Sequence, residues 1–274
     1  MAHSALPWRK PHRFTPAFDK NDAAKVVIPA TRIFDQMAII GDEVVACFVL
    51  DTAEGYVLID CLEPTARALD LIEQGFAALG YDIEGLVAIA ITHGHGDHYG
   101  NANILKDRYG ARILLSERDY RLACANEDNI DYRLPDFEVD RFIEDGDVLT
   151  FGDTRITCVA TPGHTPGCFS FIVNVSDCGT PHAVALWGGS GILPTSNASD
   201  YYESLLKFSN ACAAAGVDGE IATHPSLDNG VERAALIRNI VDGVPNPFVL
   251  GKEGYRYYEQ IFYDLAYANG IPRP

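Results

Sequence analysis

The stretch THGHGDHYGN, residues 92–101, limits what this chain can fold into more than any other feature of the sequence. It holds three of the eight histidines and one aspartate within six residues, namely His93, His95, Asp97 and His98. The apolar run LVAIAIT, residues 86–92, comes directly before it and is typical of a strand buried on both faces. Gly94 and Gly96 let the backbone bend tightly between these side chains. The sequence therefore predicts a buried strand that ends in a loop of metal-binding side chains.

Three further apolar runs, each predicted as a strand, also end in loops that carry polar side chains. The runs and the residues that follow them are 155–161 with His164, 183–187 with Ser190, and 219–223 with His224. In layered α/β folds, strand ends and their loops converge on the functional site. We therefore expect His164, Ser190 and His224 to lie near the histidine-rich loop.

The residue types in these loops are those that bind catalytic zinc, whose usual ligands are imidazole nitrogens and a carboxylate. In an extended segment, His93 and His95 point to the same side. Asp97 and His98 follow the bend at Gly96 and can turn toward a second ion. Five histidines and Asp97 divide into three ligands for each of two ions and leave positions open for water. We expect two Zn²⁺ ions per chain, and other divalent metals are compatible with the same ligands.

Helix and strand patterns alternate along the chain. Residues 44–60 predict two strands around a turn at 53–55, and residues 63–80 predict a helix whose apolar side chains share one face. Ser199 is the predicted cap of a helix over 199–216. Further helices are predicted at 101–110, 229–242 and 251–269, and further strands at 111–116 and 168–175. Strands mixed with helices predict a layered α/β fold with helices on both outer faces.

The predicted domain organisation has two parts. Residues 1–27 contain prolines and charges and are predicted to form an N-terminal arm. Residues 28–274 show no internal repeat, low-complexity tract or linker. We expect them to form one domain that contains all the candidate ligands.

Composition and charge exclude several classes of protein. The net charge of −17 argues against a nucleic-acid partner, which normally binds a basic surface. No apolar run approaches the roughly 18–20 residues that a membrane span needs. The N-terminal residues lack the apolar stretch of a secretory signal, so we expect a cytoplasmic protein; a mature form that has lost a signal would be periplasmic. The expected partner is a small-molecule substrate, and the sequence does not indicate an oligomeric state.

Taken together, the motifs resemble those of the metallo-β-lactamase superfamily. THGHGDH, TPGHTPG, GGS and THP occur in that family's order, preceded by GYVLID, which ends at Asp60. The resemblance covers residues 28–265 and implies an αββα sandwich with a binuclear zinc site in a surface groove. It implies that one metal is held by His93, His95 and His164, and the other by Asp97, His98 and His224. We expect Asp60 to support the histidine loop without binding metal.

Ser190 distinguishes the branches of this superfamily. Many members, including glyoxalase II and the lactonases, place a metal-bridging Asp after the GG pair, and other β-lactamases place a ligand Cys there. A serine hydroxyl is a poor zinc ligand. The sequence is therefore most similar to the β-lactamase subclass that uses His in both halves of its site. We expect the Ser190 hydroxyl to contact substrate or hold a water, the alternative being a turn serine.

The resemblance implies a zinc-dependent hydrolase. Two Zn²⁺ ions would share a water, lower its pKa toward about 7, and direct the resulting hydroxide at a carbonyl, with Asp97 orienting it. A β-lactam-type amide is the expected substrate, and a lactone, thioester or other small ester is the alternative. The complete ligand set argues against a non-catalytic metal-binding protein. Iron oxygenases also occur in this superfamily, but nothing here resembles an attached flavin domain.

Overall fold

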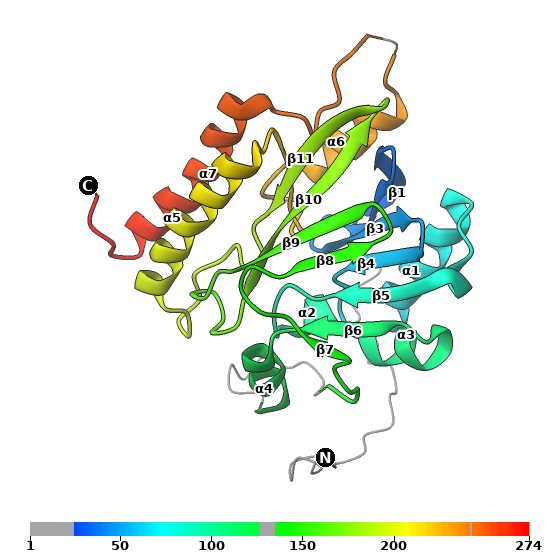
Figure 1. Cartoon of the computed structure of the whole chain (residues 1–274), viewed down its shortest axis with the longest axis horizontal. Coiled ribbons are helices and arrows are strands. Elements are labelled where there is room, and N and C mark those ends of the chain that lie inside the picture. The colour runs from blue at the N-terminus through cyan, green and yellow to red at the C-terminus, as the bar shows by residue number, and fades with distance from the viewer. Residues whose placement is uncertain (1–24, 126–134, 242, 274) are drawn as a thin grey trace.

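A computed structural model of the chain describes residues 25–125, 135–241 and 243–273. Two β-sheets lie face to face, and helices cover the outer face of each (Figure 1). The structure therefore confirms the predicted α/β fold with mixed sheets and outer helices. Nearly all of the predicted N-terminal arm, residues 1–27, lies outside the described residues, so the division into arm and domain stays a prediction.

The first sheet has seven strands in the order β1-β2-β3-β4-β5-β6-β7. Its first four strands pair antiparallel, whereas β4 through β7 pair in parallel. The strands are β1 (Val27–Phe34), β2 (Met37–Asp42), β3 (Ala46–Thr52), β4 (Gly55–Ile59), β5 (Leu86–Ala90), β6 (Arg112–Leu115) and β7 (Arg141–Phe142). The second sheet has five strands in the order β12-β11-β10-β9-β8. They are β8 (Val148–Phe151), β9 (Thr154–Ala160), β10 (Phe169–Asp177), β11 (Thr180–Leu186) and β12 (Gly219–Ile221).

Three apolar cores correspond to the three interfaces between the four layers. The central core joins the sheets and contains Phe48 of β3 and Phe171 of β10. The second lies between the first sheet and the helices α1 (Ala66–Leu79), α3 (Ala102–Tyr109) and α4 (Glu117–Ala125). The third lies between the second sheet and the helices α5 (Ala198–Ala215) and α7 (Gly251–Ala268). Each large apolar side chain buried in these cores contributes roughly 1.5–3 kcal/mol, and this arrangement is the αββα sandwich.

Strand β5 shows how the pattern of the sequence sets these layers. Ala88 and Ala90 are buried in the central core, whereas Ile89 and Ile91 are buried in the core beneath the helices. Successive side chains of a strand point to opposite faces, so a strand between two cores is apolar throughout. This burial fixes the direction in which the chain leaves β5 and begins the histidine-rich loop.

Several predicted boundaries differ from the structure. The helix predicted at 63–80 begins later, because Thr65 is its N-cap and accepts a hydrogen bond from the Ala68 amide at 3.1 Å. Ser199 is not the cap of α5: Asn197 is, since its side chain accepts from the Ser199 and Asp200 amides. The helix predicted at 229–242 corresponds to a shorter α6 (Gly230–Arg238).

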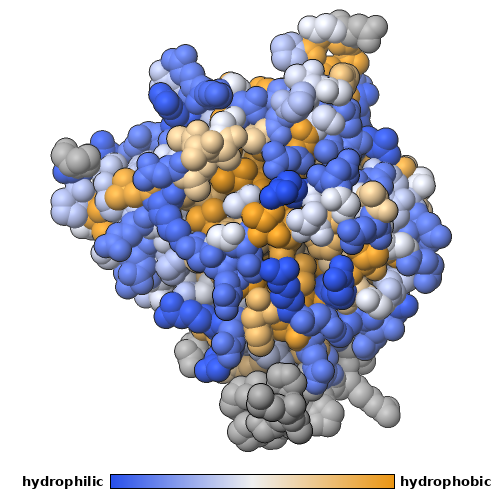
Figure 2. All heavy atoms as spheres, in the orientation of Figure 1, coloured by the Kyte–Doolittle hydropathy of each residue, from blue (hydrophilic) through white to orange (hydrophobic). Residues whose placement is uncertain are grey.

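The face shown in Figure 2 is covered largely by hydrophilic side chains around a central strip of apolar ones. Among the described residues, no helix is both long enough and apolar enough to span a membrane.

Candidate metal centre

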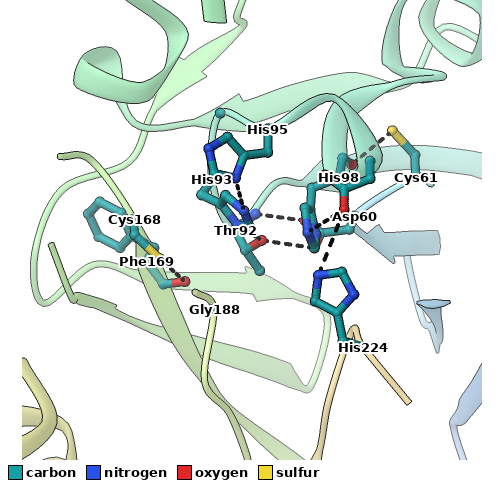
Figure 3. Close-up of polar contacts among 12 residues, drawn as sticks. Asp60, Cys61, Thr92, His93, His95, His98, Cys168, Phe169, Gly188 and His224 are labelled. Carbon is teal, nitrogen blue, oxygen red and sulfur yellow. Dashed lines mark hydrogen bonds and ion pairs between the residues drawn. The ribbon is translucent and has the colours of Figure 1, made fainter. Parts of the chain in front are cut away.

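Three loops from both sheets bring the candidate ligands together. His93, His95, Asp97 and His98 follow β5, the last two within the short helix α2 (Gly96–Tyr99). His164 follows β9 in the second sheet, and His224 follows β12. Figure 3 shows His93, His95 and His98 close together, with His224 approaching from a separate segment. The strand ends therefore converge as the sequence predicts.

The first ligand group consists of His93, His95 and His164. His95 Nδ1 lies 3.2 Å from His93 Nε2 and 3.0 Å from His164 Nε2. The three side chains belong to residues that are at most 9% exposed. Three ring nitrogens thus point at one another in a site shielded from water.

The second ligand group consists of Asp97, His98 and His224. Asp97 Oδ2 lies 3.5 Å from His98 Nε2 and 3.7 Å from His224 Nε2. Within each group all the ligand atoms lie within 4.8 Å of one another. The rings of His93 and His98, one from each group, have centroids 4.0 Å apart, so the two groups are neighbours.

The hydrogen-bond partners of the first group determine where its protons sit. The Nδ1 atom of His164 lies 2.6 Å from the Gly191 carbonyl, which can only accept, so Nδ1 carries the proton. The Thr92 hydroxyl donates to Asp60 at 2.8 Å and lies 3.0 Å from His93 Nδ1. Because the Thr92 hydroxyl has only one proton and donates it to Asp60, it must accept a hydrogen bond from His93 Nδ1. Both residues therefore keep the Nε2 lone pair free.

The second group is oriented in the same way. His98 Nδ1 lies 2.7 Å from the Asp60 carboxylate, and His224 Nδ1 lies 2.8 Å from the Val44 carbonyl. Neither acceptor can donate, so both imidazoles carry a proton on Nδ1 and direct Nε2 toward Asp97. Asp60 thus lies where the sequence predicted a supporting residue, behind a candidate ligand.

Burial and crowding keep most of these imidazoles neutral. Burial, and after it the neighbouring His95, lowers the pKa of His164 to about 3. Burial and the surrounding imidazoles also lower the pKa of His93 and of His224. His98 differs: burial lowers its pKa, but the Asp97 and Asp60 carboxylates outweigh this and raise it. Burial raises the pKa of Asp97, yet the adjacent imidazoles bring it below its usual value, which favours the ionised carboxylate.

Ser190 lies beside the first group. Its backbone carbonyl accepts a hydrogen bond from the Tyr201 hydroxyl at 2.9 Å, and the next residue, Gly191, holds His164. His182 lies apart from both groups and pairs with Asp218. The other two histidines, His3 and His12, fall outside the described residues.

Sequence reasoning missed the residues that orient the ligands from the backbone, Val44 and Gly191, and the buried Asp119 of α4. A backbone carbonyl is offered by every residue type, so no sequence signal marks the first two. Asp119 had a weak signal, since it follows a predicted strand as the other site residues do.

Comparison with known proteins gives the following relatives. A family model described as the metallo-beta-lactamase superfamily matches residues 40–178. A probable metallo-hydrolase of Burkholderia pseudomallei is 32% identical over 139 residues, which cover 46% of this chain and 43% of that protein. A human mitochondrial persulfide dioxygenase is 29% identical over 55% of this chain and 49% of its own length. A hydroxyacylglutathione hydrolase of Mesorhizobium japonicum is 32% identical over 60% of this chain and 65% of its own length.

The chain spans about half the length of the first curated relatives it matches. Solved structures match over more of the fold. The subclass B3 metallo-beta-lactamase BJP-1 of Bradyrhizobium japonicum has a TM-score of 0.77 and 27% identity, covering 89% of this chain and 95% of that chain. The FEZ-1 metallo-beta-lactamase of Legionella gormanii has a TM-score of 0.77 and 22% identity, covering 89% and 96%.

Proposed function

Because the chain belongs to the metallo-β-lactamase superfamily, we propose that it is a binuclear metal-dependent hydrolase that cleaves a carbonyl substrate. One observation carries the proposal: the structure contains two adjacent groups of three potential ligand atoms, and within each group these atoms lie within 4.8 Å of one another. Thr92, Gly191, Asp60 and Val44 hold a proton on the Nδ1 atom of four imidazoles, so that each neutral ring offers the lone pair of its inward Nε2 atom to a metal.

The residues present fit divalent metal ions. Nitrogen lone pairs that face one another at 3.0–3.2 Å repel unless a cation or proton lies between them. His98 Nε2 is buried and has no hydrogen-bond partner in the described part of the chain, although it points toward Asp97. Such an atom is costly to bury unless it is coordinated. The nitrogen-rich, sulfur-free set with one carboxylate matches Zn²⁺, and we propose two ions per chain.

The chain's own residues divide the work of the reaction. Metal ions held here would polarise a substrate carbonyl and lower the pKa of a coordinated water. The Asp97 carboxylate is 20% exposed and stays ionised, so it can accept a hydrogen bond from the attacking water and orient it. His93 and His164 are at most 9% exposed, so the first ligand group is largely shielded from bulk water. No covalent intermediate with the protein is required.

For the substrate we propose a β-lactam-type amide. This choice is supported by the likeness to a subclass B3 metallo-beta-lactamase and by Ser190, a non-ligand side chain next to the residue that holds His164. A thioester, lactone or other small ester is the second candidate, favoured by the likeness to hydroxyacylglutathione hydrolases. The proposed partner is a small molecule in either case.

The test is a substrate panel on protein of known metal content. Purified chain is stripped with a chelator, reloaded with Zn²⁺, and assayed on a β-lactam, a lactone and a thioester. We expect two ions per chain and hydrolysis that disappears in the stripped protein and returns on reloading. A His164→Ala variant serves as the control for contaminating hydrolases. Full metal loading without turnover of any of the three substrates would overturn the proposed reaction.

A further inference from the structure

Asp119 joins the two segments that supply the first ligand group. It lies in α4 and is fully buried. Its Oδ2 atom accepts hydrogen bonds from the Gly94 amide at 2.8 Å and the Thr165 hydroxyl at 2.6 Å. Its Oδ1 atom accepts from the Gly167 amide at 2.6 Å. Gly94 separates His93 from His95, and Thr165 directly follows His164, so one carboxylate holds both segments.

The two loops also pack tightly against the backbone of Asp119. A Cβ atom at Gly94 would lie 2.5 Å from the Asp119 carbonyl oxygen, and one at Gly167 would lie 2.6 Å from the Asp119 amide nitrogen. Both loops therefore reach α4 only because these two residues are glycines. Ser116 adds a further tie, since its hydroxyl donates to the Gly167 carbonyl at 2.7 Å.

We propose that Asp119 is a positioning residue that sets the distance between the His93–His95 segment and His164, and thereby the affinity of the first ligand group for metal. The inference rests on the proposed metal-binding function. The hydrogen bonds of Asp119 with Gly94, Thr165 and Gly167 involve neither a reacting atom nor the side chain of a proposed ligand. It acts through the backbone on either side of the ligands, as residues behind a metal site do.

An amide cannot replace this carboxylate in either orientation. The Gly94 and Gly167 amides can only donate, and they bond to different oxygens of Asp119. In Asp119→Asn one side-chain oxygen becomes an NH₂ group, which must face one of these two donors. With the amide oxygen toward Gly94 and Thr165, the Gly167 amide loses its acceptor. With the oxygen toward Gly167, the Gly94 amide and the Thr165 hydroxyl lose theirs, although the volume of the side chain is unchanged.

The experiment measures Zn²⁺ affinity for each ligand group separately. Asp119→Asn is placed in a His224→Ala background, which retains the first group, and in a His164→Ala background, which retains the second. We expect Zn²⁺ affinity to fall about ten- to hundredfold in the first background and to be unchanged in the second. Thr165→Val should weaken the first group by less, and Thr165→Ser, which keeps the hydroxyl, should restore it.

Asp140→Asn is the matched control for a merely structural role. Asp140 also accepts a backbone amide, from Ile113 at 2.7 Å, and pairs with Lys106, but holds no ligand segment. Equal weakening of both groups by Asp119→Asn, or wild-type affinity at the first group, would overturn the inference while leaving the proposed function intact. If Asp119→Asn does not fold, unchanged first-group affinity in Thr165→Val would overturn it. Failure of the wild-type chain to bind Zn²⁺ would overturn both.

Discussion

Replacing Asp60 by Asn should change which nitrogen of His98 carries its proton. The Thr92 amide donates to Asp60 Oδ1 at 2.7 Å and can do nothing else, so the asparagine oxygen must take that position. Its NH₂ group then faces His98 Nδ1, which lies 2.7 Å from Oδ2 in the wild type. His98 has to accept there and move its proton to Nε2. That nitrogen is the one directed at the second ligand group, and a protonated nitrogen cannot bind metal.

The size of the effect follows from the contacts that are lost. Removing a partner behind a metal-binding histidine typically costs about 10- to 100-fold in metal affinity, or about 1.4–2.8 kcal/mol. In the metal-free protein, Asp60 Oδ2 is lost as the acceptor of two buried hydrogen bonds, from His98 Nδ1 and from the Thr92 hydroxyl. The charge-assisted bond with His98 alone is worth about 1.5–3 kcal/mol in unfolding free energy. The backbone adds little, because asparagine tolerates the left-handed φ of 59° found at Asp60.

The assay is Zn²⁺ titration in the His164→Ala background, where the second group alone remains, together with urea unfolding of the metal-free protein. An NMR spectrum of the imidazole nitrogens reports the tautomer of His98 directly. Asp140→Asn, which loses stability away from the metal centre, controls for a general loosening of the fold. Wild-type Zn²⁺ affinity at the second group, or a His98 that still carries its proton on Nδ1, would refute the reasoning.

Three further predictions concern pH, Ser190 and the buried carboxyl groups of Glu220 and Asp228. Burial and neighbouring imidazoles lower the pKa of His93 and of His164 in the folded protein, whereas the same side chains in the unfolded chain take up a proton below about pH 6.5. Stability and metal content should therefore be lost as the pH falls below about 6.5. Dialysis followed by metal analysis checks this, and retention of both metals at about pH 4.5 would contradict it. Ser190→Ala should keep both metals and most activity, whereas Ser190→Asp should bind metal more tightly and favour esters over amides; loss of one metal from the alanine variant would show that Ser190 is a ligand. Burial, and then repulsion from Glu220, raises the pKa of Asp228, so the folded state keeps a proton that the unfolded chain loses above about pH 4. The Asp228→Asn variant should therefore become more stable relative to the wild type as the pH rises from about 4 to 7. Urea unfolding at both ends of that range measures this difference, and a decrease in the relative stability of the variant would contradict the prediction.

Local patterns made much of the fold predictable. Strand β5 is apolar throughout because it lies between two cores, and four candidate ligands follow it within the next eight residues. The predicted αββα layering was confirmed, since the predicted strands were short apolar runs and the predicted helices had an apolar face. The ligand roles themselves stay predictions, although the structure brings all six residues together.

Elements whose signal depends on distant neighbours were not predictable in the same way. Strand β2 is also buried along its whole length, but the apolar run in MAIIGD is only four residues long before Gly41 and Asp42. It therefore shows neither the alternation nor the longer apolar run that marks a strand. The cap of α5 is Asn197 and not Ser199, because Asn197 is the last extended residue and the helix has already begun at Ala198. Both residue types cap helices well, and the sequence alone does not say where the turn begins.

The same division between local and distant contacts runs through the metal centre. Thr92 is adjacent to His93, and Asp60 ends a motif that the sequence displays, so both could be found by reading along the chain. The Val44 carbonyl that orients His224 is 180 residues away from it in the chain. Because any residue at position 44 offers the same carbonyl, substitution there does not remove the acceptor; only a shift of the backbone between β2 and β3 does. The candidate ligands are therefore specified by residue type, whereas their protons are placed partly by the fold. A change far from these six residues can switch the tautomer of one of them without altering any of the six.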